Sequence, residues 1–77
     1  MKLYDAVVDR LQRLMHEKAA SIYSLNRDGG IATSTVSQVL HHKQKKITID
    51  ILYEITATMG VTLQEFFTDP IFNEVTD

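Results

Sequence analysis

One short segment concentrates side chains that form hydrogen bonds without carrying charge. Residues 33–41 read TSTVSQVLH. At helical spacing the valines and the leucine fall on one face, and the polar side chains fall on the other. Base pairs offer donors and acceptors in the major groove, so a short uncharged polar face suits contact with double-stranded DNA. The residues of this polar face are Thr33, Ser34, Ser37, Gln38 and His41.

Each polar side chain has an expected role. Gln38 is the first candidate for reading a base, because an amide pairs bidentately with adenine. Thr33, Ser34 and Ser37 are expected next, at base edges or nearby phosphates. For Tyr23, a half-buried aromatic role is an equal alternative to a DNA contact. Contacts with the DNA backbone are expected from Ser21, Tyr23, Thr35, His41, Lys43, Lys45 and Lys46.

Catalysis and metal binding find little support in the sequence. No spacing matches a nucleophile elbow, a phosphate-binding glycine loop or a metal pair. His41 and His42 are neighbours, so on a helix they would point about 100° apart, and the chain has no cysteine. We therefore expect no enzymatic activity, no metal and no cofactor. No ligand pocket or small-molecule effector is predictable in so short a chain.

Two helices with a glycine turn between them must position the polar face. Ser21 is expected to cap a helix from Ile22 to about Asp28. Gly29 and Gly30 are expected to break that helix, because glycine takes left-handed backbone angles without steric cost. The second helix is expected from about Thr33 to His41, with Thr33 as its cap because Ala32 has no side-chain oxygen.

A longer helix is predicted before this pair. Apolar residues recur at three- and four-residue steps over residues 3–18, beginning with Leu3. Arg10 and Arg13 occupy its polar side, where they are either solvated or in contact with a phosphate.

Two more helices are predicted after the pair. The segment ITIDI alternates like a strand, but no partner strand is evident, so we expect Thr48 to cap a helix through Met59. Gly60 ends that helix. A capping box from Thr62 to Glu65 begins a fifth helix, over residues 63–68.

These segments resemble a known family. SLNRDGGIATSTVSQVL and ITIDILYEITATMGVTLQEFF are similar to the helix-turn-helix and the fourth and fifth helices of Cro and lambda-repressor-like (Xre-type) regulators. The resemblance covers roughly residues 21–67. It implies one compact all-α domain of five helices over residues 1–77, with its helix-turn-helix at about 21–42. It also implies a sequence-specific transcriptional regulator, with repression the expected mode. Asn26 departs from the small residue that the family usually has four positions before the turn glycine.

Composition sets further bounds. The net charge of −2 argues mildly against nucleic acid. The distribution is more informative, because Lys43, Lys45 and Lys46 directly follow the polar segment, whereas acids concentrate near both ends of the chain. No apolar run approaches the ~20 residues of a membrane helix, and no signal-peptide profile is present. We therefore expect a cytoplasmic protein without membrane contact.

The C-terminal tail, residues 69–77, and the residues just before it are rich in apolar side chains. Phe67, Ile71, Phe72 and Val75 either close the core or contact a second copy. A homodimer is expected, because two-fold dimers read paired half-sites about one helical turn apart. An alternative function has the same fold but no DNA binding. In this alternative the domain is a protein-interaction module, such as an antitoxin or a regulator adaptor, that acts through this Phe-rich surface. The acidic net charge favours it slightly.

Overall fold

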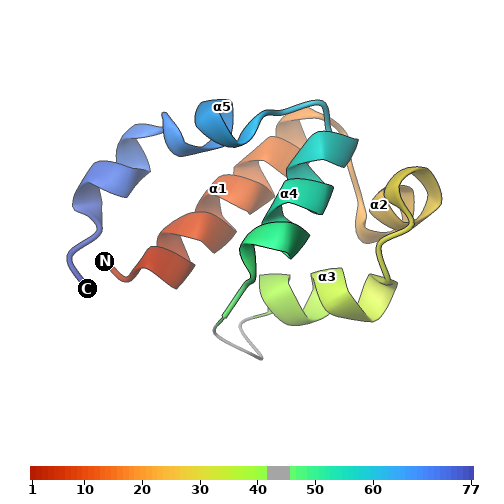
Figure 1. The fold of residues 1–77 in the computed structure, drawn as a ribbon, viewed down its shortest axis with the longest axis horizontal. Helices are drawn as coiled ribbons and strands as arrows, with labels where there is room; N and C mark the ends of the chain where they lie inside the picture. Colours follow the sequence, from red (N-terminus) through yellow and green to blue (C-terminus); the bar gives the residue numbers. More distant parts are fainter. Residues whose placement is uncertain (42–45) are drawn as a thin grey trace.

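The computed structural model describes residues 1–41 and 46–77, and this part of the chain is helical without strands. Figure 1 shows α3 below α1 and α4, with α2 at one end and the two termini side by side at the other. The expected five-helix, all-α fold is confirmed. The helices are α1 (Leu3–Glu17), α2 (Ile22–Gly29), α3 (Thr33–Leu40), α4 (Ile49–Thr58) and α5 (Leu63–Phe67), followed by a 3₁₀ helix over Pro70–Glu74.

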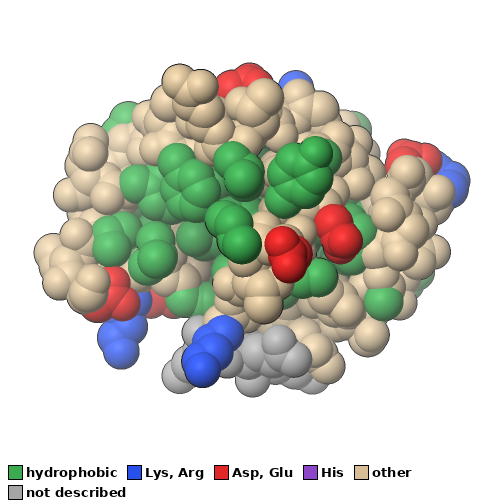
Figure 2. Space-filling view, viewed as in Figure 1, with side chains coloured by type: hydrophobic (Ala, Val, Ile, Leu, Met, Phe, Trp, Pro, Cys, Tyr) green, Lys and Arg blue, Asp and Glu red, His purple; other side chains and the backbone are tan. Residues whose placement is uncertain are grey.

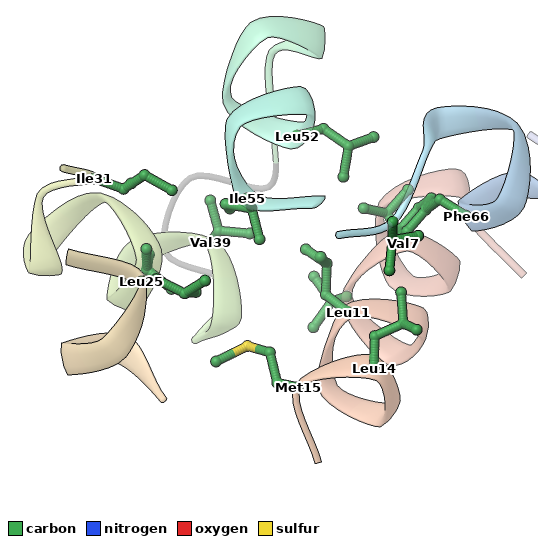
Figure 3. Packing of buried hydrophobic residues seen from close by; sticks show 13 residues of the cluster. Val7, Leu11, Leu14, Met15, Leu25, Ile31, Val39, Leu52, Ile55 and Phe66 are labelled. Carbon is green, nitrogen blue, oxygen red and sulfur yellow. The ribbon is translucent and has the colours of Figure 1, made fainter. Parts of the chain in front are cut away.

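One hydrophobic core joins all five α-helices (Figure 3). Leu11 of α1 and Phe66 of α5 are fully buried, and Leu25 and Ile55 bring α2 and α4 into the same cluster. Burial of each large apolar side chain stabilises the fold by about 1.5–3 kcal/mol. Because α3 contributes Val36 and Val39 to this core, its orientation is fixed by the whole domain.

Local capping defines where three of the helices begin. The hydroxyls of Ser21, Thr48 and Thr62 accept hydrogen bonds from backbone amides in the first turns of α2, α4 and α5. At the start of α5 the Glu65 carboxylate accepts a hydrogen bond from the Thr62 amide at 3.2 Å, which completes the predicted capping box. Gly60 follows α4 with a positive φ of 75°. These predictions from the sequence are confirmed.

The predicted cap of α3 is wrong. Ala32 occupies the N-cap position with φ of −58° and ψ of 134°, and Thr33 is already the first helical residue. An alanine side chain has no oxygen, so no side-chain hydrogen bond caps this helix. The stability of α3 therefore depends on packing rather than on a local capping motif.

Arg10 and Arg13 both bind the C-terminal part of the chain. Arg10 is largely buried there, which corrects its expected solvated role, whereas Arg13 stays exposed as expected but is paired. Arg10 donates to the carbonyls of Phe66 at 3.0 Å and Glu65 at 3.1 Å. Arg13 makes a bidentate pair with Asp69, at 2.9 and 3.0 Å. This hydrogen bond is the main reason that the pKa of Asp69 falls to about 2. The arginines thus fasten the end of α5 and the following turn to α1.

The C-terminal tail folds back onto the domain. Phe72 packs against the core, with its ring centroid 5.7 Å from that of Phe66 and 4.9 Å from that of Phe67. Ile71 and Val75 are partly buried. The dimer role expected for these residues stays a prediction, and Phe67 is the most exposed of the four.

A hydrophobic patch remains on the surface (Figure 2). Leu3, expected on the buried face of α1, is 50% exposed, because it lies at the end of the helix beyond the core. We call the surface formed by Leu3, Ile49, Tyr53 and Phe67 the α1–α4 face; all four side chains are exposed. None of the described helices is long and apolar enough to span a bilayer.

Candidate nucleic-acid interface

The turn between α2 and α3 sets their relative orientation. Gly30 has φ of 68°, a left-handed conformation that favours glycine. Gly29, however, is still helical, which corrects the expectation that both glycines break the helix. A Cβ atom on Gly29 would collide with the Thr58 hydroxyl of α4. Gly29 is therefore required for close approach of α2 and α4, and Gly30 for the change in chain direction.

Asn26 stabilises the same turn. Its side-chain amide donates a hydrogen bond to the Ile31 carbonyl at 3.0 Å. The backbone carbonyl of Asn26 accepts a hydrogen bond from the Gly30 amide at 2.9 Å. The residue that departs from the family pattern thus holds both sides of the turn together. The chain then enters the core at Ile31, which is buried.

α3 presents the predicted polar face outward. Val36 and Val39 point into the core with 1% and 3% exposure, whereas Thr33 and Ser34 are exposed. Ser37 and Gln38 are partly exposed, so they lie at the border between the core and solvent. The segment is helical, as the expected DNA contact requires.

The end of α3 lies slightly earlier than predicted. The helix ends at Leu40, and His41 is its C-cap. The Ser37 hydroxyl and the Nδ1 atom of His41 are 3.0 Å apart and share a hydrogen bond. This bond holds the imidazole beside the polar face of the last turn.

One group of predicted residues comes together where α2 begins. Tyr23, Thr33, Ser34 and Ser37 line a shallow hollow of about 310 Å³. Tyr23 is 79% exposed, so its alternative role as a half-buried aromatic is wrong. Ser21 is exposed at the start of α2, where its hydroxyl caps the Ser24 amide at 3.0 Å. The start of α2 and the outer face of α3 thus form one continuous surface.

Thr35 belongs to a second group. It lines a different hollow, of about 260 Å³, together with Lys46 and Thr48 at the approach to α4. The predicted backbone contacts therefore flank α3 on two sides. Lys43 and Lys45 lie outside the described residues.

The positively charged side chains near α3 differ in whether they are paired with an acid. Arg27, at the end of α2, pairs with the adjacent Asp28 at 2.9 Å, and this hydrogen bond lowers the pKa of Asp28. Lys46 is exposed and forms no ion pair with another described residue. Among the residues that the structure places, no three His, Asp or Glu side chains cluster as a metal site would require.

One contact to α3 was not foreseen from the sequence. The Tyr4 hydroxyl donates to the Val39 carbonyl in the last turn of α3. The apolar periodicity places Tyr4 next to the buried stripe of α1, but nothing local identifies an acceptor so far along the chain. The contact means that α1 helps to fix the helix that carries the polar face.

The chain was then compared with known proteins. Residues 10–70 match the model of a family described as the Cro/C1-type HTH DNA-binding domain. A comparison with curated proteins and one with solved structures gave no match. The matched range contains the turn, both helices that flank it, and α4 and α5.

Proposed function

The chain belongs to the Cro/C1-type HTH DNA-binding domain family and is a DNA-binding transcription regulator; we propose that it reads its operator by placing α3 in the major groove. The observation that carries this proposal is the division of α3 into two sides. Val36 and Val39 hold it in the core, while Ser34 and the rest of the polar face point outward. An α-helix fits the major groove, and hydroxyl and amide groups match the base edges there.

The polar side chains divide into base and backbone contacts. Gln38 reads an adenine through its amide, and Thr33, Ser34 and Ser37 contact neighbouring base edges or phosphates. Backbone contacts come from Ser21 and Tyr23 at the start of α2, from Thr35 and His41 of α3 and its C-cap, and from Lys46. Lys43 and Lys45, which follow α3 in the sequence, are proposed to add two more. The two separate hollows that flank α3 support this arrangement, because the major groove is bordered by two phosphate backbones.

Repression is the proposed mode of regulation. A compact domain that occupies an operator excludes other proteins from the same base pairs, and this effect needs no further activity. Two copies bind paired half-sites about one helical turn apart.

Selection of duplexes from a random pool tests the proposal. Gln38→Ala should weaken the selected site by about 1–3 kcal/mol and relax preference at one base pair. Lys46→Ala should weaken all sequences alike and lower the salt slope by about 0.9. Gln64→Ala, which removes an exposed amide on α5, is the matched control and should change neither property.

Two results would count against this assignment. Equal losses for Gln38→Ala and Lys46→Ala across random sequences would remove the distinction between base and backbone contacts. Failure of the wild-type protein to retain any duplex at low salt would favour the protein-interaction role instead.

A further inference from the structure

We propose that His41 is a positioning residue for base recognition, because its ring sets whether the Ser37 hydroxyl accepts a hydrogen bond from a base or donates one. The inference rests on the proposed function, in which α3 lies in the major groove and Ser37 contacts a base edge. It goes beyond that function by giving His41 an effect on sequence preference in addition to its contact with the DNA backbone.

The last turn of α3 brings the two side chains together. Ser37 lies in this turn and His41 is the C-cap, four residues later, so both are on the same side of the helix. The Nδ1 atom of His41 is 3.0 Å from the Ser37 hydroxyl oxygen, an ordinary distance for a hydrogen bond between nitrogen and oxygen. In the described part of the chain, no other side chain forms a hydrogen bond or an ion pair with this ring.

The pair is held in place and is accessible. The Tyr4 hydroxyl binds the Val39 carbonyl, which fixes this turn of α3 against α1. His41 is exposed, and Ser37 lines the hollow that it shares with Tyr23. A base edge can therefore reach the Ser37 hydroxyl while His41 remains bonded to it.

The second ring nitrogen, Nε2, decides the direction of the bond. Neutral imidazole carries one N–H, and the nitrogen that holds the proton is set by the hydrogen bond that the other nitrogen makes. A phosphate oxygen accepts hydrogen bonds, so a backbone contact of His41 through Nε2 requires the proton on Nε2. Nδ1 then accepts the single proton of the Ser37 hydroxyl. The hydroxyl has only lone pairs left for the DNA, and these accept from the amino group of adenine N6 or cytosine N4.

Protonation of the ring reverses the bond. Imidazolium carries an N–H on both nitrogens, so Nδ1 donates to the Ser37 oxygen. The hydroxyl proton becomes free to bind O6 of guanine or O4 of thymine, which only accept. Histidine ordinarily changes its charge between about pH 5 and pH 8. The base preference at the position that Ser37 contacts should therefore change with pH in this range.

Neighbouring charges do not supply the same response. The described titratable groups on the segments packed against this end of α3 are Tyr4 and Asp5 of α1, Tyr23 of α2 and Lys46 before α4. Carboxylate, phenol and ammonium side chains ordinarily keep one charge state between about pH 5.5 and pH 8. A change of preference in this range therefore indicates a histidine, and the other two histidines of the chain are His16 and His42.

Fluorescence anisotropy with the selected duplex and its single-base-pair variants, at about pH 8 and about pH 5.5, tests the proposal. Ser37→Ala identifies the base pair, because the preference there should be lost at both pH values. In the wild-type protein, guanine or thymine at that position should gain about fivefold in affinity relative to adenine or cytosine at the lower pH, as expected for one hydrogen bond. His41→Asn keeps a hydrogen-bonding group near the position of Nδ1 but does not titrate, so its preference should be equal at both pH values.

The matched controls are His16→Asn and His42→Asn, which should keep the pH response of the wild-type protein. Circular dichroism at both pH values checks that each variant is folded. Three results would overturn the proposal. The first is a higher affinity for all sequences alike at low pH, which a cationic ring beside a phosphate would produce without Ser37. The second is an unchanged pH response in His41→Asn, and the third is a Ser37→Ala variant that keeps every base preference.

The same assay separates this inference from the proposed function. A wild-type protein that binds no duplex at either pH would refute both. A protein that selects a duplex, but whose preference at the Ser37 position does not depend on pH, would refute the role of His41 alone.

Discussion

The Tyr4 hydroxyl donates a hydrogen bond to the Val39 carbonyl, which joins the start of α1 to the last turn of α3. Carbonyls in the last turn of a helix have no partner within it, so Tyr4 supplies one from a distant part of the chain. Burial, followed by the nearby Asp5 charge, raises the pKa of Tyr4 above its ordinary value, so the shift favours the protonated hydroxyl that donates this bond. The C-terminal end of α3 is thus positioned by α1.

Tyr4→Phe should lower the free energy of unfolding by about 0.5–1.5 kcal/mol, because it removes this hydrogen bond and keeps the ring. Urea unfolding followed by circular dichroism measures the change. Tyr23→Phe removes a hydroxyl from an exposed ring and should have almost no effect. Equal losses in the two variants would show that the contact with Val39 is not responsible.

Gly29→Ala should destabilise the fold by about 1–3 kcal/mol, because the new methyl group collides with Thr58. A second substitution, Thr58→Ala, removes the hydroxyl and should restore part of the loss. Gly30→Ala gives the comparison: it is strained by its positive φ and meets no neighbour, so Thr58→Ala should not rescue it. Thermal unfolding of the three single and two double variants tests this prediction, and equal rescue of both glycine variants by Thr58→Ala would contradict it.

Asp69 should make stability depend on pH in the acid range. Its pKa is lowered to about 2, chiefly by the hydrogen bond from Arg13. A carboxylate with a depressed pKa stabilises the fold above its ordinary value near 4 and loses that contribution as the pH falls toward 2. The melting temperature of the wild-type protein should therefore exceed that of Asp69→Asn at pH 6, and the difference should shrink between about pH 4 and pH 2.

Arg13→Gln serves as the control for this pH dependence. It leaves Asp69 in place and removes its main partner, while Arg10 stays 3.4 Å from the carboxylate and the Ile71 amide still donates to it. Its melting temperature should therefore show a pH profile that is partly flattened, between those of the wild type and Asp69→Asn. A constant difference between wild type and Asp69→Asn from pH 6 to pH 2 would mean that the Arg13 pair contributes nothing to stability.

Ala19→Gly should stabilise the protein by about 0.5–1 kcal/mol. Ala19 has φ of 54°, a left-handed conformation that is costly for alanine and free of steric cost for glycine. Ala57→Gly is the matched control with the opposite sign, since Ala57 is exposed within α4 and glycine there should cost about 1 kcal/mol. Urea unfolding measures the stability of both variants. A loss of stability in Ala19→Gly would show that the backbone at residue 19 is not strained by the alanine side chain.

Features set by near neighbours in the chain were predictable. Ser21, Thr48 and Thr62 were identified as caps because the amides that they bind lie within the next turn. Gly29 and Gly30 were not distinguished, since the atom that requires Gly29 belongs to Thr58 on another helix. Asp69 could not be matched with Arg13 for the same reason: their sequence separation is 56 residues.

In the candidate site, too, contacts between residues far apart in the sequence could not be predicted. The 3.6-residue period placed Ser34 outside and Val36 inside correctly. It placed Thr35 off the polar face, but it could not show that Thr35 lines a separate hollow with Lys46. The contact of Tyr4 with Val39 depends on how α1 crosses α3, and no pattern within either helix contains that information.

The division of α3 into an inward face that packs in the core and an outward polar face has an evolutionary consequence. Its inward valines hold the fold, whereas side chains such as Ser34 contribute little to the interior. Single substitutions at the outward positions should therefore change which operators are bound while leaving the melting temperature almost constant. A lineage of such proteins could acquire new regulatory targets one base pair at a time, without first acquiring a more stable scaffold.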